Sequence, residues 1–163
     1  MRKGNGFGAV AAGLVLAAGS ASAATETMPP LPPELEEKVA QAQAACADFD
    51  GGTFAMEWSA VQRVDLDGDL VPDWVLNENG FSCSSAVSIY GGTGGSLSHF
   101  LVAGALSSIL NQGWQVATIG PHRVVFADVH GANCGGINPT PCVTASVWDR
   151  QAKAWRSATA QWE

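Results

Sequence analysis

Basic residues, and charge of either sign, are scarce in this sequence. Lysine and arginine together number 8 against 15 aspartates and glutamates, and charged residues make up only 14% of the 163-residue chain. So few basic residues argue against a protein whose task is to bind nucleic acid, because affinity for the phosphate backbone comes from Lys and Arg. With 47% hydrophobic residues, the chain is also too apolar for a disordered tail. Its length predicts a single domain.

The sequence also lacks an apolar run long enough to cross a bilayer, which takes about 20 residues. An uncharged run over residues 7–18 follows Arg2 and Lys3 and precedes the small residues 21–23. This order is typical of a secretory signal peptide. We therefore predict that residues 1–23 are removed and that the mature chain is secreted or periplasmic, with no membrane-spanning segment. Because the first cysteine is Cys46, none lies near the cleavage site to carry a lipid anchor.

Four cysteines are present, at positions 46, 83, 134 and 142. In an oxidising compartment an even number of cysteines indicates disulfides, and four allow three pairings. We favour a bridge from Cys134 to Cys142, which would close a short loop containing two prolines, and this choice leaves Cys46 to pair with Cys83. The alternative is a metal site formed by His130, Cys134 and Cys142, although thiolate zinc sites usually have closer cysteine pairs and a fourth ligand.

The part that follows the signal peptide begins with a proline-rich segment, residues 24–33, for which we expect an extended leader. Residues 34–47 are predicted to form a helix. Glutamates occupy its first turn, where the helix dipole favours them. Leu35, Val39, Ala42 and Cys46 recur at helical spacing, which predicts one apolar face.

After residue 52 the sequence favours strands separated by turns. We predict a single α+β domain over residues 34–163, made of mostly antiparallel β-sheet with one N-terminal helix and stabilised by disulfides. For residues 106–111 we expect one helical turn, and for the glycine-rich residues 91–95 a loop. The predicted strands cover residues 53–58, 61–64, 74–76, 86–90, 99–103, 114–119, 123–129, 143–148 and 154–159, and the last four form two hairpins.

The most informative motif is an acidic loop, Asp-Leu-Asp-Gly-Asp-Leu-Val-Pro-Asp, over residues 65–73. Its carboxylates stand at loop positions 1, 3, 5 and 9, and a hard cation such as Ca²⁺ prefers 6 to 8 oxygen ligands. Apolar segments with the character of strands flank the loop, and Leu76 stands where an EF-hand has its glutamate, so the sequence is not an EF-hand. The alternative interpretation is a solvated acidic hairpin turn, for which Asp-Gly is a good local signal.

This loop resembles the D-x-D-x-D-G-x-x-D calcium loops of integrin-type (FG-GAP or VCBS-like) repeats over residues 63–77. The resemblance implies calcium as the bound ion. The sequence departs from this pattern at Leu70, where those loops usually have glycine. If this position needs a positive φ, leucine there costs about 1 kcal/mol or more. The implied ligands are the side chains of Asp65, Asp67, Asp69 and Asp73, with the backbone carbonyl of Val71.

A wider resemblance covers most of the mature chain. The order of motifs is similar to that of small exported proteobacterial proteins of unknown function, which implies export and a compact fold but no activity. The motifs are Cys46, the acidic loop, residues 81–85, residues 113–116, His130-Gly131, Cys134-Gly135-Gly136 and Trp148.

These observations favour an exported, non-enzymatic binding or envelope-associated domain with a structural calcium loop, acting on a protein or envelope partner that the sequence does not identify. One alternative is a secreted protein inhibitor of a lytic enzyme that presents the loop of residues 134–142. Another is a small hydrolase using His130, which stands beside Asp128 in a possible acid–base pair. A structural role for His130, bonded to the backbone, is the simpler explanation. The six tryptophans are expected mainly in the core, with Trp148 and Trp155 facing each other across a hairpin.

Overall fold

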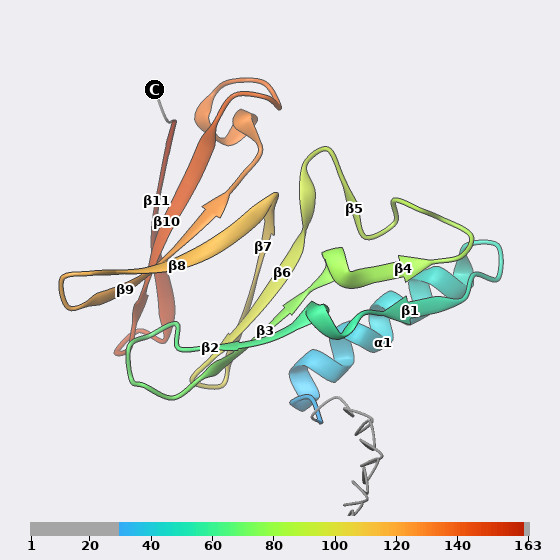
Figure 1. Ribbon diagram of the computed structural model, residues 1–163, viewed down its shortest axis with the longest axis horizontal. Coiled ribbons are helices and arrows are strands. Elements are labelled where there is room, and N and C mark those ends of the chain that lie inside the picture. The colour runs from blue at the N-terminus through green and yellow to red at the C-terminus, as the bar shows by residue number, and fades with distance from the viewer. Residues whose placement is uncertain (1–29, 162–163) are drawn as a thin grey trace, which may run out of the picture.

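The computed structural model describes residues 30–161, so the predicted signal peptide and most of the proline-rich leader lie outside the described residues. One helix and eleven strands form three layers (Figure 1). The helix packs on one face of a central sheet, and a four-stranded sheet packs on the other face. The fold class predicted from the sequence is confirmed. No helix among the described residues is long and apolar enough to cross a membrane.

The elements follow one another in the order helix, central sheet, second sheet. Three short 3₁₀ helices, η1 (Trp58–Ala60), η2 (Glu78–Gly80) and η3 (Gly131–Cys134), connect them. The helix and strands are α1 (Pro33–Asp48), β1 (Phe54–Met56), β2 (Val61–Val64), β3 (Asp73–Asn77), β4 (Phe81–Cys83), β5 (Gly91–Gly92), β6 (Gly95–Val102), β7 (Ala105–Asn111), β8 (Gly113–Ile119), β9 (His122–Asp128), β10 (Cys142–Asp149) and β11 (Ala154–Gln161).

Helix α1 forms where the apolar stripe predicted it. Pro33 occupies the first turn, where a missing N–H costs nothing, and acidic side chains follow it. Leu35, Ala42 and Cys46 are buried, and Leu35 and Ala42 pack against Leu76 of β3 and other residues of the central sheet. The helix therefore covers one face of that sheet.

All strand pairs are antiparallel. The central sheet contains β2, β3, β6 and β7, with β5 extending its edge at the start of β6, and β1 pairs with β4 in a separate ribbon. In the second sheet the strand order is β11-β10-β9-β8. Val75 and Phe100 point away from α1 and pack with Val125 and Trp148 between the two sheets. The core thus lies on both faces of the central sheet.

Both hairpins predicted near the C-terminus are confirmed. Strands β8 and β9 pair across Gly120 and Pro121, and β10 pairs with β11 so that Trp148 stands opposite Trp155, their rings 5.3 Å apart in a T-shaped arrangement. Two other expectations were wrong. The segment predicted as a helical turn is strand β7, paired along its whole length with β6. Residues 86–90, predicted as a strand, form turns with no partner strand.

The described residues contain two disulfides. Cys46 at the end of α1 is bonded to Cys83 of β4, and Cys134 of η3 is bonded to Cys142 at the start of β10. This is the pairing favoured by the sequence, and it leaves neither thiol of Cys134 and Cys142 free for the alternative metal site. Disulfides of this kind persist in oxidising compartments.

Candidate functional site

The acidic loop joins β2 to β3 at the seam between the two sheets (Figure 1). One oxygen from each of Asp65, Asp67 and Asp73 lies within 4.8 Å of the others, close enough to share one ion. Asp69 does not belong to this group. Its Oδ1 accepts a hydrogen bond of 2.7 Å from the N–H of Val71, which is 60% exposed. The ligand roles that the resemblance implied for Asp69 and Val71 stay predictions.

The loop's own N–H groups fix the three carboxylates. Asp65 accepts from Gly68 N–H at 2.7 Å, Asp67 from Asp69 N–H at 2.9 Å, and Asp73 from Leu66 N–H at 2.9 Å. Each bond occupies one oxygen of its carboxylate, and a carboxylate has two. The loop is therefore already wound around the point where the three side chains meet.

Left-handed backbone at two positions makes this winding possible. Gly68 has φ 81°, which glycine adopts freely, and Leu70 has φ 68°, which costs an L-residue with a Cβ about 1 kcal/mol or more. Leu70 is 88% exposed, so no packing compensates that cost. Leu70, which stands where the calcium loops usually have glycine, is thus the residue with the strained backbone.

Arginines from both sheets hold the loop's backbone. Arg63 of β2 donates to the carbonyls of Pro72 and Asp73, Arg123 of β9 donates to Asp65 O at 3.0 Å, and Arg150 donates to Asp67 O at 2.9 Å. Because Arg123 lies on β9 and Arg150 lies in the turn between β10 and β11, these bonds connect the loop to the second sheet.

Charge compensation within the loop is incomplete. Arg150 Nε lies 3.5 Å from Asp67 Oδ2, and the Asp67 side chain is only 6% exposed. Within residues 30–161, Asp65 and Asp73 form no ion pair. Burial raises the pKa of Asp73 above its usual value, and the charges of Asp67, Asp69 and Asp65 raise it further, against the lowering effect of the Leu66 N–H. A divalent cation would remove this repulsion.

A polar cleft of about 390 Å³ opens at the other end of β3. Its lining comes from η1, β2, the ends of β3 and β7, η2, the start of β6 and the start of β8. The side chains that line it are amides and hydroxyls, with Glu57 as the single charged group and Trp114 as the single aromatic ring.

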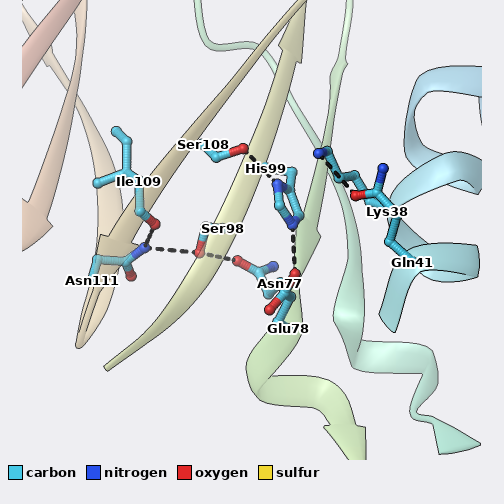
Figure 2. A network of polar contacts seen from close by, with 9 residues as sticks. All are labelled: Lys38, Gln41, Asn77, Glu78, Ser98, His99, Ser108, Ile109 and Asn111. Carbon is cyan, nitrogen blue, oxygen red and sulfur yellow. Dashed lines mark hydrogen bonds and ion pairs between the residues drawn. The ribbon is translucent and has the colours of Figure 1, made fainter. Parts of the chain in front are cut away.

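A chain of buried hydrogen bonds forms the floor of this cleft (Figure 2). Ser98 Oγ donates to Asn77 Oδ1 at 2.8 Å and accepts from Asn111 Nδ2 at 3.0 Å. Asn77 Oδ1 also accepts from Trp114 Nε1 at 2.7 Å, and Asn111 Nδ2 also donates to Ile109 O at 3.0 Å. The three polar residues are no more than 5% exposed, so their side chains are held in place.

A second polar chain crosses the face of the central sheet toward α1. His99 is 2% exposed, and its Nδ1 lies 2.6 Å from Ser108 Oγ while its Nε2 lies 2.8 Å from Glu78 Oε1 (Figure 2). Ser108 is exposed on β7. Sequence reasoning considered His130 and missed this serine–histidine–carboxylate arrangement, because its members come from three different elements.

His130 has the structural role that is usual for a backbone-bonded histidine. Its Nδ1 accepts from the N–H of Ala132 at 3.1 Å and so caps η3, which ends at Cys134, where the disulfide-closed loop begins. Among the described residues, His130 forms no hydrogen bond or ion pair with Asp128.

Comparison with models of protein families, with curated proteins and with solved structures yields no match to this chain, so its function must be inferred from these sites alone.

Proposed function

We propose that this chain is an exported, non-enzymatic binding domain in which residues 65–73 hold a structural calcium ion. The observation that carries the proposal is the convergence of the Asp65, Asp67 and Asp73 carboxylates within 4.8 Å. Three like charges this close are unfavourable unless solvent or a cation compensates them.

The ligand chemistry supports calcium over a transition metal. The converging atoms are all carboxylate oxygens, which suit hard cations, whereas zinc sites usually include histidine or cysteine. Calcium takes 6 to 8 oxygens at about 2.3–2.6 Å in a flexible shell. The Val71 carbonyl, Asp69 and water would complete that shell in a loop that the protein has already wound.

The position of the loop supports a structural role for the ion. Arg123 and Arg150 connect it to the second sheet, and Asp73 is the first residue of β3. An ion bound there would stabilise the seam between the sheets. Export is supported by the two disulfides and by the predicted signal peptide.

The polar cleft supports a binding role. No histidine is present among its lining residues to act as a base for the serines there, and no cysteine or lysine supplies another nucleophile. The amides of Asn77, Asn111 and Gln112 are fixed by hydrogen bonds to neighbouring residues, as expected where a ligand must find its hydrogen-bond partners in position.

Thermal unfolding in EGTA, in Ca²⁺ and in Mg²⁺ tests the calcium site. Wild type should gain about 1 kcal/mol of stability when free Ca²⁺ is about five times the dissociation constant. Asp67→Asn should lose most of this gain, although its Oδ1 can still accept from Asp69 N–H. Asp128→Asn, the same chemical change at an exposed carboxylate outside the loop, should keep it. Identical melts of wild type in EGTA and in millimolar Ca²⁺ would reject the calcium site.

One observation favours a second candidate, a hydrolase with Ser108 as nucleophile. Ser108, His99 and Glu78 are linked by hydrogen bonds in the order that a serine nucleophile, its base and an orienting carboxylate require. Ser108 is not among the residues that line the polar cleft, which ranks this candidate second.

A fluorophosphonate probe tests the second candidate. Ser108 Oγ would bond to phosphorus, fluoride would leave, and the hydroxyl proton would pass to His99 Nδ1. Labelling of the wild type that disappears in Ser108→Ala but persists in Ser107→Ala would support the hydrolase. A wild type that is not labelled would reject it.

A further inference from the structure

We infer that the polar cleft at the end of β3 binds a neutral saccharide. This inference rests on the proposal that the chain is a binding domain, and it does not depend on the calcium loop.

The orientation of the floor amides follows from their partners. An indole N–H is only a donor, so the atom of Asn77 that meets Trp114 Nε1 is its carbonyl oxygen. A backbone carbonyl is only an acceptor, so the atom of Asn111 that meets Ile109 O is its amide nitrogen. The Ser98 hydroxyl must then donate to Asn77 and accept from Asn111. The proton positions in this chain are therefore determined.

This assignment leaves Asn111 Oδ1 without a donor. Both N–H groups of Asn111 are in use, and no described residue donates to its oxygen. Asn111 is only 4% exposed and lines the cleft, yet its oxygen is not among the fully buried polar atoms that lack a partner. The small accessible part of the side chain thus includes this acceptor, and it faces the cleft.

Gln112, the next residue in the sequence, also lines the cleft and supplies a second fixed acceptor. Gln112 Nε2 donates to Thr93 O at 2.8 Å and to Asn138 Oδ1 at 3.0 Å, which occupies both N–H groups and leaves Oε1 free. Asn77 supplies a donor, because Nδ2 has one long bond of 3.4 Å to Ala60 O and a second N–H. A ligand that fits must offer several O–H or N–H donors and at least one acceptor, as sugar hydroxyls do.

The charge and the apolar content of the cleft lining narrow the class of ligand that can bind there. The lining has no lysine, arginine or histidine to bind a phosphate, sulfate or uronate, and no aliphatic side chain to bind a lipid tail. Its one carboxylate, Glu57, lies on the exposed rim. Trp114 forms part of the wall and is the one aromatic residue in the lining. Amides with fixed orientation beside a partly exposed tryptophan suit the polar edge and the apolar C–H face of a sugar ring.

The volume sets the size of the ligand. About 390 Å³ lies at the low end of the range for small-molecule sites, roughly 300–1,000 Å³. The cleft therefore holds one or two sugar rings, as a free oligosaccharide or as the end of a longer glycan.

Titration of the ¹⁵N-labelled protein followed by NMR tests the inference. The probes are neutral gluco-, galacto- and chito-oligosaccharides, an oligogalacturonate as the acidic sugar, and spermidine as a cation. The indole N–H of Trp114, assigned with Trp114→Phe, reports from the cleft wall, because it donates to Asn77. We expect this resonance to shift saturably with at least one neutral sugar and not with oligogalacturonate.

Matched variants locate the binding. Gln62→Ala removes an exposed rim amide and should weaken sugar binding about fivefold, as expected for one lost hydrogen bond. Gln115→Ala, the same change on the exposed surface of β8, should leave the affinity unchanged. The inference is overturned if no neutral sugar shifts the Trp114 resonance. It is also overturned if sugars shift other resonances but not that of Trp114, and these shifts persist in Gln62→Ala. A third contrary result is that only spermidine binds and that Glu57→Gln abolishes its binding. The titrations are carried out in EGTA, so they do not depend on a bound calcium ion. A negative titration would therefore reject the saccharide site, whereas identical melts in EGTA and Ca²⁺ would reject the calcium site.

Discussion

Asp73→Asn separates the electrostatic cost of the acidic loop from its role as a ligand. Asp73 is half-buried, and its Oδ2 accepts the N–H of Leu66 at 2.9 Å. Asparagine keeps an oxygen that can accept this bond and removes the charge. Any change in stability therefore reports mainly on the interaction of Asp73 with the neighbouring carboxylates and with a cation.

The size of the effect follows from the spacing of the charges. Two unit charges 4.8 Å apart repel by about 0.9 kcal/mol in water and by about 3.5 kcal/mol at an effective dielectric constant of 20. Asp73 faces two such charges, while solvent and the Arg150 guanidinium reduce the sum. We expect Asp73→Asn to raise the free energy of unfolding by about 1–2 kcal/mol in EGTA. In saturating Ca²⁺ the order should reverse, because the variant lacks a ligand.

The pH dependence has a definite sign. Because burial and like charges raise the native pKa of Asp73 above its unfolded value, the native state holds this proton more tightly. The contribution of Asp73 to stability is therefore highest at acidic pH and is lost as pH rises through its native pKa. In EGTA, the advantage of Asp73→Asn over wild type should shrink as pH falls. In Ca²⁺ the wild type should lose its advantage over the same range, because protonation competes with the ion.

Urea unfolding followed by tryptophan fluorescence, at several pH values with EGTA or Ca²⁺, measures these differences. A variant that is less stable than wild type in EGTA at neutral pH would refute the electrostatic reasoning. So would a difference between the two proteins that does not change with pH.

Three further perturbations test other parts of the structure by the same unfolding measurement. Leu70→Gly relieves a left-handed backbone at an exposed residue and should stabilise the protein by up to about 1 kcal/mol. A loss of stability would show that backbone strain at Leu70 is not the main effect of this residue on the free energy of unfolding. Removing the Cys46–Cys83 bridge, whose cysteines are 37 residues apart, should lower the free energy of unfolding by about 4 kcal/mol. Removing the Cys134–Cys142 bridge, with a separation of 8, should lower it by about 2.5 kcal/mol, because a shorter loop restricts the unfolded chain less. The reverse order would contradict this loop-entropy argument. Ser98→Ala should cost about 1–3 kcal/mol, because it leaves an N–H of buried Asn111 unpaired, and a neutral effect would mean that the cleft floor tolerates rearrangement.

The parts of the fold that local pattern determines could be predicted from the sequence. Leu35, Ala42 and Cys46 recur at helical spacing, and all three are buried in α1. The hairpin β8–β9 turns across Gly120-Pro121, which interrupts two apolar runs. In both cases the information lies within a few turns or within two adjacent strands.

The two errors arose where tertiary pairing overrode local pattern. In residues 105–111 the spacing of Leu106, Ile109 and Leu110 resembles a helical turn, but β6 offers an unpaired edge and a turn at Ala103-Gly104 brings the chain back along it. Residues 86–90 are rich in β-formers, yet no strand is available to pair with them. Tyr90 instead donates its hydroxyl to Ala42 O at 2.7 Å, which ties the segment to α1.

Of the two candidate sites, the acidic loop could be predicted from local sequence, and the polar cleft could not. The spacing of Asp65, Asp67 and Asp73 is local, so their convergence was predictable, whereas the burial of Asp67 under Arg150 was not. The floor of the cleft joins four strands through individually ordinary residues such as Asn77 and Ser98. No sequence interval relates such residues, and only the register of the sheet brings them together.

Strand β3 connects the two candidate sites, since it begins at Asp73 in the acidic loop and ends at Asn77 in the cleft. Coupling between sites requires an element with two arrangements whose balance both ligands shift. This strand is paired with β2 on one edge and β6 on the other, and its central residues Val75 and Leu76 are fully buried on opposite faces. Such a strand has one packed arrangement, so calcium should stabilise the folded state without changing saccharide affinity within it. Titrations in EGTA and in Ca²⁺, at a temperature where both forms are fully folded, should give the same dissociation constant. A calcium-dependent constant would show that β3 has a second arrangement, and linkage would then require the sugar to change calcium affinity by the same factor.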